Sequence, residues 1–341
     1  MLKISFKKYQ LQFRQPVLTS RGEMSVKNGY YIFVSDEKNT GVGECSFIEG
    51  LSIDDLENYQ STLLALAKST QSNSIPDLKL FPSIQFGFET ALLDLQNGGN
   101  KILFKSKFTE GKKQVAINGL VWMGKKDFML QQIQQKVKDG FACIKIKVGA
   151  IDFDEEVSLL RFIRNKFPAD VIEIRLDANG AFSFADTLQK LETLAAFQIH
   201  SIEQPIKAKQ IELMKNVCAN SPIPVALDEE LIGVHGTVQE DVLDMIKPAY
   251  IILKPSLLGG FKVCDEWIKK AEARKINWWA TSALESNIGL NAIAQWVFTK
   301  NNLLPQGLGT GSLYTNNIES PLYIQHGALG YNPENSWTEN L

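Results

Sequence analysis

Short apolar runs alternate with amphipathic helical patterns from about residue 111 onward. The runs are rich in β-branched residues and show little alternation, which is typical of parallel strands buried on both faces. They lie at 144–146, 171–176, 199–202, 223–227, 250–253 and near 278–281. Apolar residues at helical spacing predict helices at 154–166, 184–197, 208–219, 238–246, 260–274 and 288–300. This alternation predicts βα units that form a parallel α/β barrel.

The first part of the chain follows another pattern. Residues 4–13 and 29–35 alternate apolar and polar positions, as antiparallel strands do, with a long connection at 17–27 between them. A third strand is expected at 41–45, after a turn. Two helices should follow, at 52–68 and 84–96, the first with Ser52 as its N-cap. The N-terminal part is therefore an α+β module.

Length supports two domains. A chain of 341 residues exceeds one ordinary core, and a barrel takes about 250 residues. The helix and strand pattern weakens over the last 25 or so residues. We expect a capping domain at 1–110, completed by about 315–341, and a barrel at 111–314.

Charge and composition limit the kinds of molecule that this protein is expected to bind. A formal net charge of −2 argues against nucleic acid or an anionic membrane surface. No apolar run approaches the roughly 18 residues that span a bilayer, and the start does not resemble a signal peptide. The four cysteines are scattered without a metal-binding spacing. We expect a cytoplasmic protein with a small-molecule substrate; its oligomeric state is left open.

Five ionisable residues recur at intervals of 25 to 30 residues: Lys147, Asp177, Glu203, Asp228 and Lys254. Each follows directly on, or ends, one of the apolar runs. The interval matches one strand plus one helix of a barrel, and barrel enzymes place their chemistry at the carboxyl ends of the strands. The five side chains should therefore meet at the mouth of the barrel.

The three carboxylates predict a metal site. Asp177, Glu203 and Asp228 would repel one another without a cation, and oxygen-only ligation suits Mg²⁺, with Mn²⁺ as a substitute. The three histidines of the chain all lie outside this register. Glu229 and Glu230 could hydrogen-bond the site from behind. Taken alone, Asp177 before Ala-Asn-Gly would more often be a turn former.

The two lysines that flank the carboxylates are candidate bases. Lys145 and Lys147 lie two apart on a strand, so both should point into the barrel. At about 7 Å apart their ammonium groups repel, which should lower their pKa values towards neutrality. Lys254 lies across the barrel. A surface edge strand for the first pair, or a capping charge for Lys254, is the alternative. The implied reaction is proton abstraction beside a metal-bound carboxylate.

This order of residues resembles the enolase superfamily, and within it the muconate-lactonizing subgroup. Lys-x-Lys on the second barrel strand, three carboxylates on the third to fifth and a lysine on the sixth carry the resemblance. It implies a modified (β/α)7β barrel with a capping domain formed by the N-terminal region and the C-terminal tail. A histidine base, which the mandelate racemase subgroup would need, is missing near 278–281.

Six segments sharpen the resemblance to the o-succinylbenzoate synthase family: 18–22, 50–52, 82–89, 117–120, 281–286 and 307–311. It implies a carbon-oxygen lyase, a Mg²⁺-dependent dehydratase of menaquinone biosynthesis that acts on a dicarboxylate. By this resemblance Lys147 removes the α-proton and then protonates the leaving hydroxyl, Lys254 stabilises the intermediate, and Lys145 tunes Lys147.

The resemblance also suggests substrate contacts. Arg21 could act in a lid over the barrel mouth, although a solvated arginine explains it equally well. Ser282 and Ser286 could contact the succinyl tail, although Ser286 could instead be a helix cap. Gly309 and Thr310 lie in an uncharged Gly-Leu-Gly-Thr-Gly segment that suits an anion. Glu230 departs from the family, in which many members have a small serine there.

Two other functions remain open at this stage. An N-acylamino acid racemase or dipeptide epimerase would use the same two lysines for two-base exchange. Dipeptide epimerases carry an acidic Asp-x-Asp where this chain has the uncharged 307–311 segment. A non-catalytic binding protein on the same barrel should have lost at least one of the five ionisable residues, and all five are present.

Overall fold

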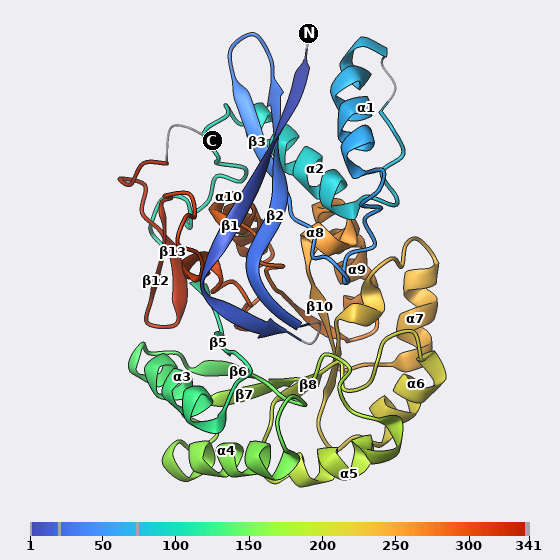
Figure 1. The fold of residues 1–341 in the computed structure, drawn as a ribbon, viewed down its shortest axis with the longest axis vertical. Coiled ribbons are helices and arrows are strands. Elements are labelled where there is room, and N and C mark those ends of the chain that lie inside the picture. The colour runs from blue at the N-terminus through green and yellow to red at the C-terminus, as the bar shows by residue number, and fades with distance from the viewer. Residues whose placement is uncertain (1, 20–21, 73–74, 338–341) are drawn as a thin grey trace.

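The computed structural model describes residues 2–19, 22–72 and 75–337. Its N-terminal part is an antiparallel sheet in the order β1-β2-β3 with two helices packed against it (Figure 1). The elements are β1 (Lys3–Thr19), β2 (Gly22–Ser35), β3 (Thr40–Cys45), α1 (Tyr59–Ser72) and α2 (Pro82–Gln96). The inner face of the sheet and the two helices share one apolar core, which includes Ile32, Leu66 and Ile84.

Two sequence expectations fail in this region. The expected connection at 17–27 is largely strand, because β1 continues past a register shift and pairs Val17 with Met24. Helix α1 begins at Tyr59 and not at Ser52. The Ser52 hydroxyl instead accepts a hydrogen bond from the Ile48 amide at 2.8 Å, which closes a turn ahead of the helix. Pairing and turn closure here outweigh the local helical pattern.

The barrel is built on a seven-stranded parallel sheet within the described chain, in the order β11-β10-β9-β8-β7-β6-β5. Its strands are β5 (Gly119–Val121), β6 (Cys143–Lys147), β7 (Glu173–Asp177), β8 (Ser201–Glu203), β9 (Val225–Leu227), β10 (Tyr250–Leu253) and β11 (Asn277–Ala280). Neighbouring strands are all parallel, and the largest apolar core surrounds them. The predicted α/β barrel is confirmed.

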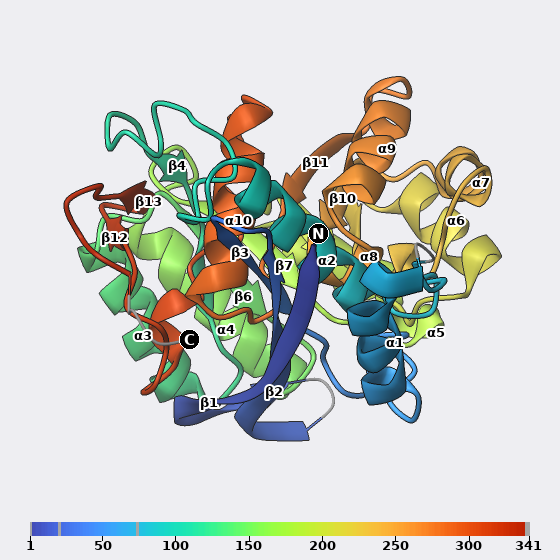
Figure 2. The same ribbon diagram turned by 90° about the horizontal axis from the view of Figure 1, so that it is seen from above.

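Helices on the outside of the barrel alternate with these strands, as Figure 2 shows from above. They are α3 (Lys126–Lys138), α4 (Phe153–Lys166), α5 (Phe184–Ala195), α6 (Ile211–Asn220), α7 (Val238–Ile246), α8 (Pro255–Leu258), α9 (Phe261–Glu272) and α10 (Asn287–Thr299). Six of them match predicted segments. Sequence patterning missed α3 and the four-residue α8. Helix α3 buries only Met129 and Ile133 fully and so has a weak apolar stripe.

The barrel closes through a short eighth segment. Gln306 bridges to Ile117 just before β5, and Gly307 bridges to Thr281 just after β11, both in parallel fashion. The Asn118 amide donates to the Gln306 carbonyl at 2.9 Å. Seven βα units followed by this short bridging segment match the expected (β/α)7β arrangement. The seam is held by single bridges and not by long ladders.

The C-terminal tail contacts two earlier parts of the chain, β4 (Val115–Ala116) and β1. Strands β12 (Leu322–Gln325) and β13 (Ala328–Tyr331) form a hairpin whose second strand pairs with β4. The segment before the hairpin lies against β1, where the Thr315 amide donates to the Gln12 carbonyl at 2.9 Å. Short 3-10 turns, η1 (Glu229–Leu231) and η2 (Gly311–Leu313), complete the elements.

Glu44 of β3 joins the N-terminal sheet to the barrel. This fully buried carboxylate accepts hydrogen bonds from the amides of Ser286 and Gly289, both at 2.8 Å, at the N-terminus of α10. It also accepts from the hydroxyls of Ser286 and Tyr9. A carboxylate is favourable there because amide groups and the helix dipole both point at it.

We expect Glu44→Gln to lower the free energy of unfolding by about 3 kcal/mol. The substitution removes the negative charge and places the glutamine NH2 group against a backbone N-H group that needs an acceptor. Urea denaturation measures this loss. Glu37→Gln, on the exposed turn after β2, is the matched control and should change stability little. Equal midpoints for the two variants would contradict a joining role for Glu44.

Candidate active site

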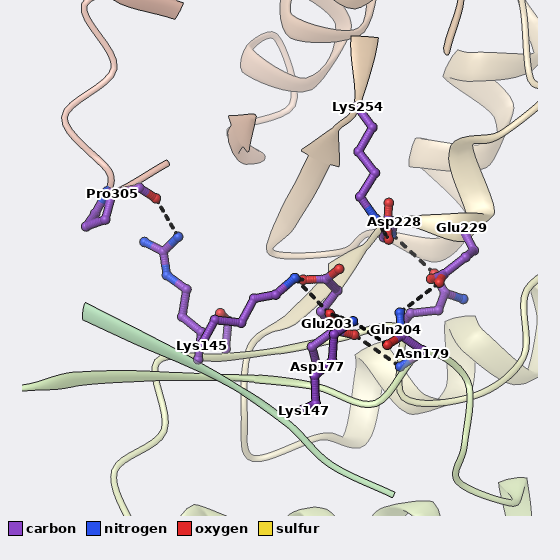
Figure 3. A network of polar contacts seen from close by, with 12 residues as sticks. Lys145, Lys147, Asp177, Asn179, Glu203, Gln204, Asp228, Glu229, Lys254 and Pro305 are labelled. Carbon is purple, nitrogen blue, oxygen red and sulfur yellow. Dashed lines mark hydrogen bonds and ion pairs between the residues drawn. The ribbon is translucent and has the colours of Figure 1, made fainter. Parts of the chain in front are cut away.

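The five ionisable residues predicted from the sequence meet at one end of the barrel (Figure 3). Lys147, Asp177 and Glu203 are the last residues of β6, β7 and β8, and the register aligns Lys147 with Asp177 and Asp177 with Glu203. Asp228 and Lys254 directly follow β9 and β10. Parallel strands bring their carboxyl ends to the same edge, so sequence positions far apart become neighbours.

Both lysines of β6 contact one oxygen of Asp177. The Lys145 and Lys147 ammonium nitrogens lie 2.7 Å and 2.6 Å from Asp177 Oδ2. Lys145 also donates to Glu203 Oε2 at 2.6 Å. The Lys145 side chain is 6% exposed and that of Lys147 is 15% exposed. Lys147 is therefore the more accessible of the two.

The expectation that mutual repulsion lowers the lysine pKa values is wrong for Lys145. Burial lowers the pKa of Lys145, but Asp177 and Glu203 raise it by more, so it lies above its usual range. The pKa of Lys254 is also raised, because Asp228 and Glu203 outweigh its burial. The spacing predicted that lysines and carboxylates would meet, but the expected pKa shift took account only of the repulsion between the two ammonium groups and not of the carboxylates that contact them.

Lys254 approaches the carboxylates from the side opposite Lys147. Figure 3 shows its side chain extending from the end of β10 towards Asp228, while Lys147 extends from β6 towards Asp177. The Lys254 ammonium group donates to Asp228 Oδ2, and both side chains are largely buried. The site therefore presents a cation on each side of a carboxylate cluster.

Asn179 belongs to this network, although sequence reasoning did not select it. Its Oδ1 accepts from Lys147 Nζ at 2.5 Å, and its Nδ2 donates to Glu229 Oε1 at 2.9 Å. Its backbone is left-handed, with φ of 44°. Asn179 carries no distinguishing signal in the sequence, because asparagine before glycine is common in turns.

Gln204 and Glu230 brace the loops behind the carboxylates. Gln204 Oε1 accepts from the Asp228 amide at 3.2 Å, and Gln204 Nε2 donates to Glu230 Oε2 at 3.2 Å. Glu230 also accepts from the Lys209 amide at 2.8 Å. Glu230 thus contacts Gln204 and not the carboxylate cluster. Glu229 and Glu230 support the site through Asn179 and Gln204, in the manner expected from the sequence.

The three carboxylates offer donors suited to a divalent cation. Among residues 2–19, 22–72 and 75–337, no three carboxylate, imidazole or thiol side chains converge as a complete ligand set. Glu203 Oε1 is buried without a hydrogen-bond partner in this part of the chain. Burial raises the pKa of both Glu203 and Asp228, so their ionised forms require nearby positive charge. Oxygen donors of this kind fit Mg²⁺.

A cavity of about 120 Å³ lies beside the cluster and is lined by Lys147, Lys254 and Asn179. Three of the predicted substrate contacts, Ser282, Gly309 and Thr310, also line it. Ser286 does not: it caps α10 and donates to Glu44, so the alternative explanation as a helix cap holds. Arg21 lies outside the described residues.

Comparison with known proteins identifies the family. Residues 1–95 match the sequence model described as "MenC, N-terminal domain", and residues 129–332 match "Enolase C-terminal domain-like". The o-succinylbenzoate synthase of Desulfotalea psychrophila is 44% identical over 96% of this chain and 99% of its own. The chain belongs to the o-succinylbenzoate synthase family. The predicted resemblance and the predicted lyase class are confirmed.

Solved structures agree with this assignment to the o-succinylbenzoate synthase family. The crystal structure of MenC from Desulfotalea psychrophila covers 96% of this chain and 99% of its own, with a TM-score of 0.87 and 42% identity. Epimerases are more distant. The L-amino acid-D/L-Glu epimerase of Francisella philomiragia is 28% identical over 72% of this chain and 66% of its own.

Proposed function

We propose that Lys147 acts as the proton-transfer group in the dehydration of 2-succinyl-6-hydroxy-2,4-cyclohexadiene-1-carboxylate to 2-succinylbenzoate, a step of menaquinone biosynthesis. The observation that carries this proposal is the placement of Lys147 and Lys254 on opposite sides of a buried carboxylate cluster, beside one cavity. Membership in the o-succinylbenzoate synthase family supports the substrate.

Lys147, as a neutral amine, takes the proton from the ring carbon that bears the carboxylate. The electron pair left behind expels the hydroxyl group from the neighbouring carbon, and the Lys147 ammonium group returns the proton to that hydroxyl. Water leaves and the ring becomes aromatic. One lysine can serve both steps because base and acid act on the same face, which is a syn elimination.

Lys254 stabilises the negative charge from the opposite face, as a fixed ammonium group in a buried site does. Lys145 is a positioning residue, because it contacts Asp177 and Glu203. Asp177, Glu203 and Asp228 would hold Mg²⁺, with Mn²⁺ as a substitute. A bound divalent cation would neutralise charge that develops on the substrate carboxylate.

The N-terminal region serves as the cap of this site. Residues 1–110, completed by about 315–341, form the proposed capping domain, and 111–314 form the barrel. Met24, Ile48 and Leu51 from the N-terminal part line the cavity, which supports a role in excluding water.

In the part of the chain that is described, no helix is long and apolar enough to cross a membrane. Four free thiols support a cytoplasmic location.

A second candidate function is racemisation of an N-acylated amino acid. Two lysines on opposite sides of one cavity can exchange a proton between the two faces of a carbon, and an epimerase relative supports the idea. The uncharged Gly-Leu-Gly-Thr-Gly segment at 307–311 disfavours a dipeptide substrate, whose ammonium group needs an acidic partner.

An ultraviolet assay tests the proposed function. With Mg²⁺ present, we expect the purified protein to convert the cyclohexadiene substrate to 2-succinylbenzoate, with a change in absorbance as the ring aromatises. Parallel incubation of N-succinyl amino acids in D₂O tests racemisation. Deuterium at the α-carbon without any dehydration would replace the first function by the second.

A further inference from the structure

The residues of the barrel seam that line the cavity are uncharged, and the charged residues of the lining come from other segments: Glu49, Lys145, Lys147, Glu229 and Lys254. The cluster occupies the ends of β7, β8 and β9, whereas β11, Gln306–Gly307 and β5 close the ring on the other side. Two residues of the seam that line the cavity, Asn118 and Thr281, have no role in the proton-transfer chemistry above. Both carry buried polar atoms that lack a hydrogen-bond partner within the described part of the chain.

Thr281 presents its hydroxyl at this seam. The residue is 9% exposed, and its Oγ1 has no hydrogen-bond partner within the described chain. Its neighbour across the bridge is Gly307, on which a Cβ atom would lie 2.5 Å from Thr281 Oγ1. The glycine therefore leaves the space that the Thr281 hydroxyl occupies. An unpaired buried hydroxyl is costly unless a ligand completes its hydrogen bond.

Asn118 presents its amide on the other side of the same seam. It is 3% exposed, and its Oδ1 is buried with no hydrogen-bond partner among residues 2–19, 22–72 and 75–337. Rotation of an amide by 180° exchanges oxygen and nitrogen, so this position can also offer a donor. Asn118 further lines an adjoining cleft of about 850 Å³, so a ligand that extends past it has room.

The neighbouring hydroxyls, by contrast, have already donated their protons. Thr310 Oγ1 donates to Ser282 Oγ at 2.8 Å, and Ser282 Oγ donates to the buried Glu285 carboxylate at 2.5 Å. A hydroxyl has one proton, so neither has another to give to an anion while these bonds persist. The sequence assigns the succinyl tail to Ser282 and Ser286 and an anion to the 307–311 segment. Among the side chains that line the cavity, the hydroxyls of Ser282 and Thr310 are already committed, whereas Asn118 and Thr281 carry buried polar atoms without a partner in the described chain.

We propose that Asn118 and Thr281 bind the terminal carboxylate of the succinyl arm and thereby determine specificity for a dicarboxylate. This inference rests on the proposed function. The ring carboxylate would lie at the cation site of Asp177, Glu203 and Asp228, and the second carboxylate would reach the opposite, uncharged arc. Neutral hydrogen-bond donors can bind a carboxylate there, because a hydrogen bond to an ionised acceptor is stronger than one between neutral groups.

Ligand discrimination tests this proposal. The probes are 2-succinylbenzoate and 2-butanoylbenzoate, in which a methyl group replaces the terminal carboxylate, and binding is measured by calorimetry in the presence of Mg²⁺. Wild type should prefer the succinyl compound. Thr281→Val and Asn118→Leu should each weaken 2-succinylbenzoate about tenfold and leave 2-butanoylbenzoate unchanged, since a hydrogen bond to a charged group is lost.

Thermal stability separates binding from a structural role. Valine removes an unpaired hydroxyl, so the Tm of Thr281→Val should stay the same or rise while ligand discrimination falls. Thr187→Val is the matched control. Thr187 lies on α5, away from the cavity, and its hydroxyl donates to the carbonyl of Ser183, the N-cap of that helix. That variant should have a lower Tm than the wild type and the same preference for 2-succinylbenzoate over 2-butanoylbenzoate.

The outcomes are distinguishable from failure of the proposed function. If both seam variants still prefer 2-succinylbenzoate over 2-butanoylbenzoate as strongly as the wild type does, the subsite is overturned. Turnover by the wild type would in that case still support the dehydratase function. A wild type that neither turns over the cyclohexadiene nor binds 2-succinylbenzoate would overturn the proposed function and the subsite with it.

Discussion

Lys147→Ala is expected to lower kcat for the dehydration about 10³-fold, because general acid–base groups typically contribute 10² to 10⁴. Lys147 is the more accessible lysine of β6 and the one that contacts both Asp177 and Asn179. The substitution leaves Lys145 paired with Asp177 and Glu203, so the strand ends should keep their arrangement. Steady-state kinetics by the ultraviolet assay measures the effect.

The control for this variant is Lys215→Ala, which removes an exposed lysine of α6 that only approaches Glu212. It should keep wild-type kcat and KM. Calorimetric binding of 2-succinylbenzoate to Lys147→Ala should persist, because the lysine is proposed to move a proton and not to hold the product. A variant that retains more than a tenth of the wild-type kcat would exclude Lys147 as the proton-transfer group.

Removal of divalent cations is expected to abolish turnover, with a loss of at least about 10³-fold, because a metal ion contributes several kcal/mol of charge stabilisation. The structural basis is three carboxylates on adjacent strands, with Glu203 Oε1 lacking a partner in the described structure. Treatment with EDTA followed by dialysis, and then titration with Mg²⁺, should remove and restore activity. Mn²⁺ should restore it as well.

Stability gives a second readout that does not depend on activity. A cation that binds only the folded protein should stabilise it by about 2.7 kcal/mol at 100 times its Kd. Mg²⁺ should therefore raise the Tm of the wild type and fail to do so in Asp228→Asn. If EDTA-treated protein keeps full turnover, the carboxylate cluster serves only to pair with the lysines.

The barrel and the charged residues at its mouth could be predicted because both depend on short-range sequence features. Buried parallel strands require continuous apolar runs, and each run ends where a charged residue first meets the barrel mouth. The regular strand-plus-helix spacing of the five residues from Lys147 to Lys254 was therefore enough to predict that they lie at the strand ends. Helix α7 and strand β10 were predicted to the residue for the same reason.

Other features depended on partners far away in the chain. Strands β1 and β2 extend through a segment with little strand pattern, because each provides hydrogen bonds for the other. The pKa of Lys145 is raised by carboxylates 32 and 58 residues away. The role of Ser286, the N-cap of α10, was decided by Glu44, which is 242 residues distant and lies in the N-terminal sheet.

What the sequence by itself determined was therefore the barrel, the residues at its mouth and the class of reaction that such residues perform. Only the tertiary structure decided which polar groups are already paired. Asn118 and Thr281 show this most clearly, since each is an ordinary residue in the sequence and becomes a candidate ligand only because its surroundings leave a buried polar atom without a partner in the described chain. Hydrogen-bond satisfaction is a property of the assembled fold, because it depends on which distant groups come within reach.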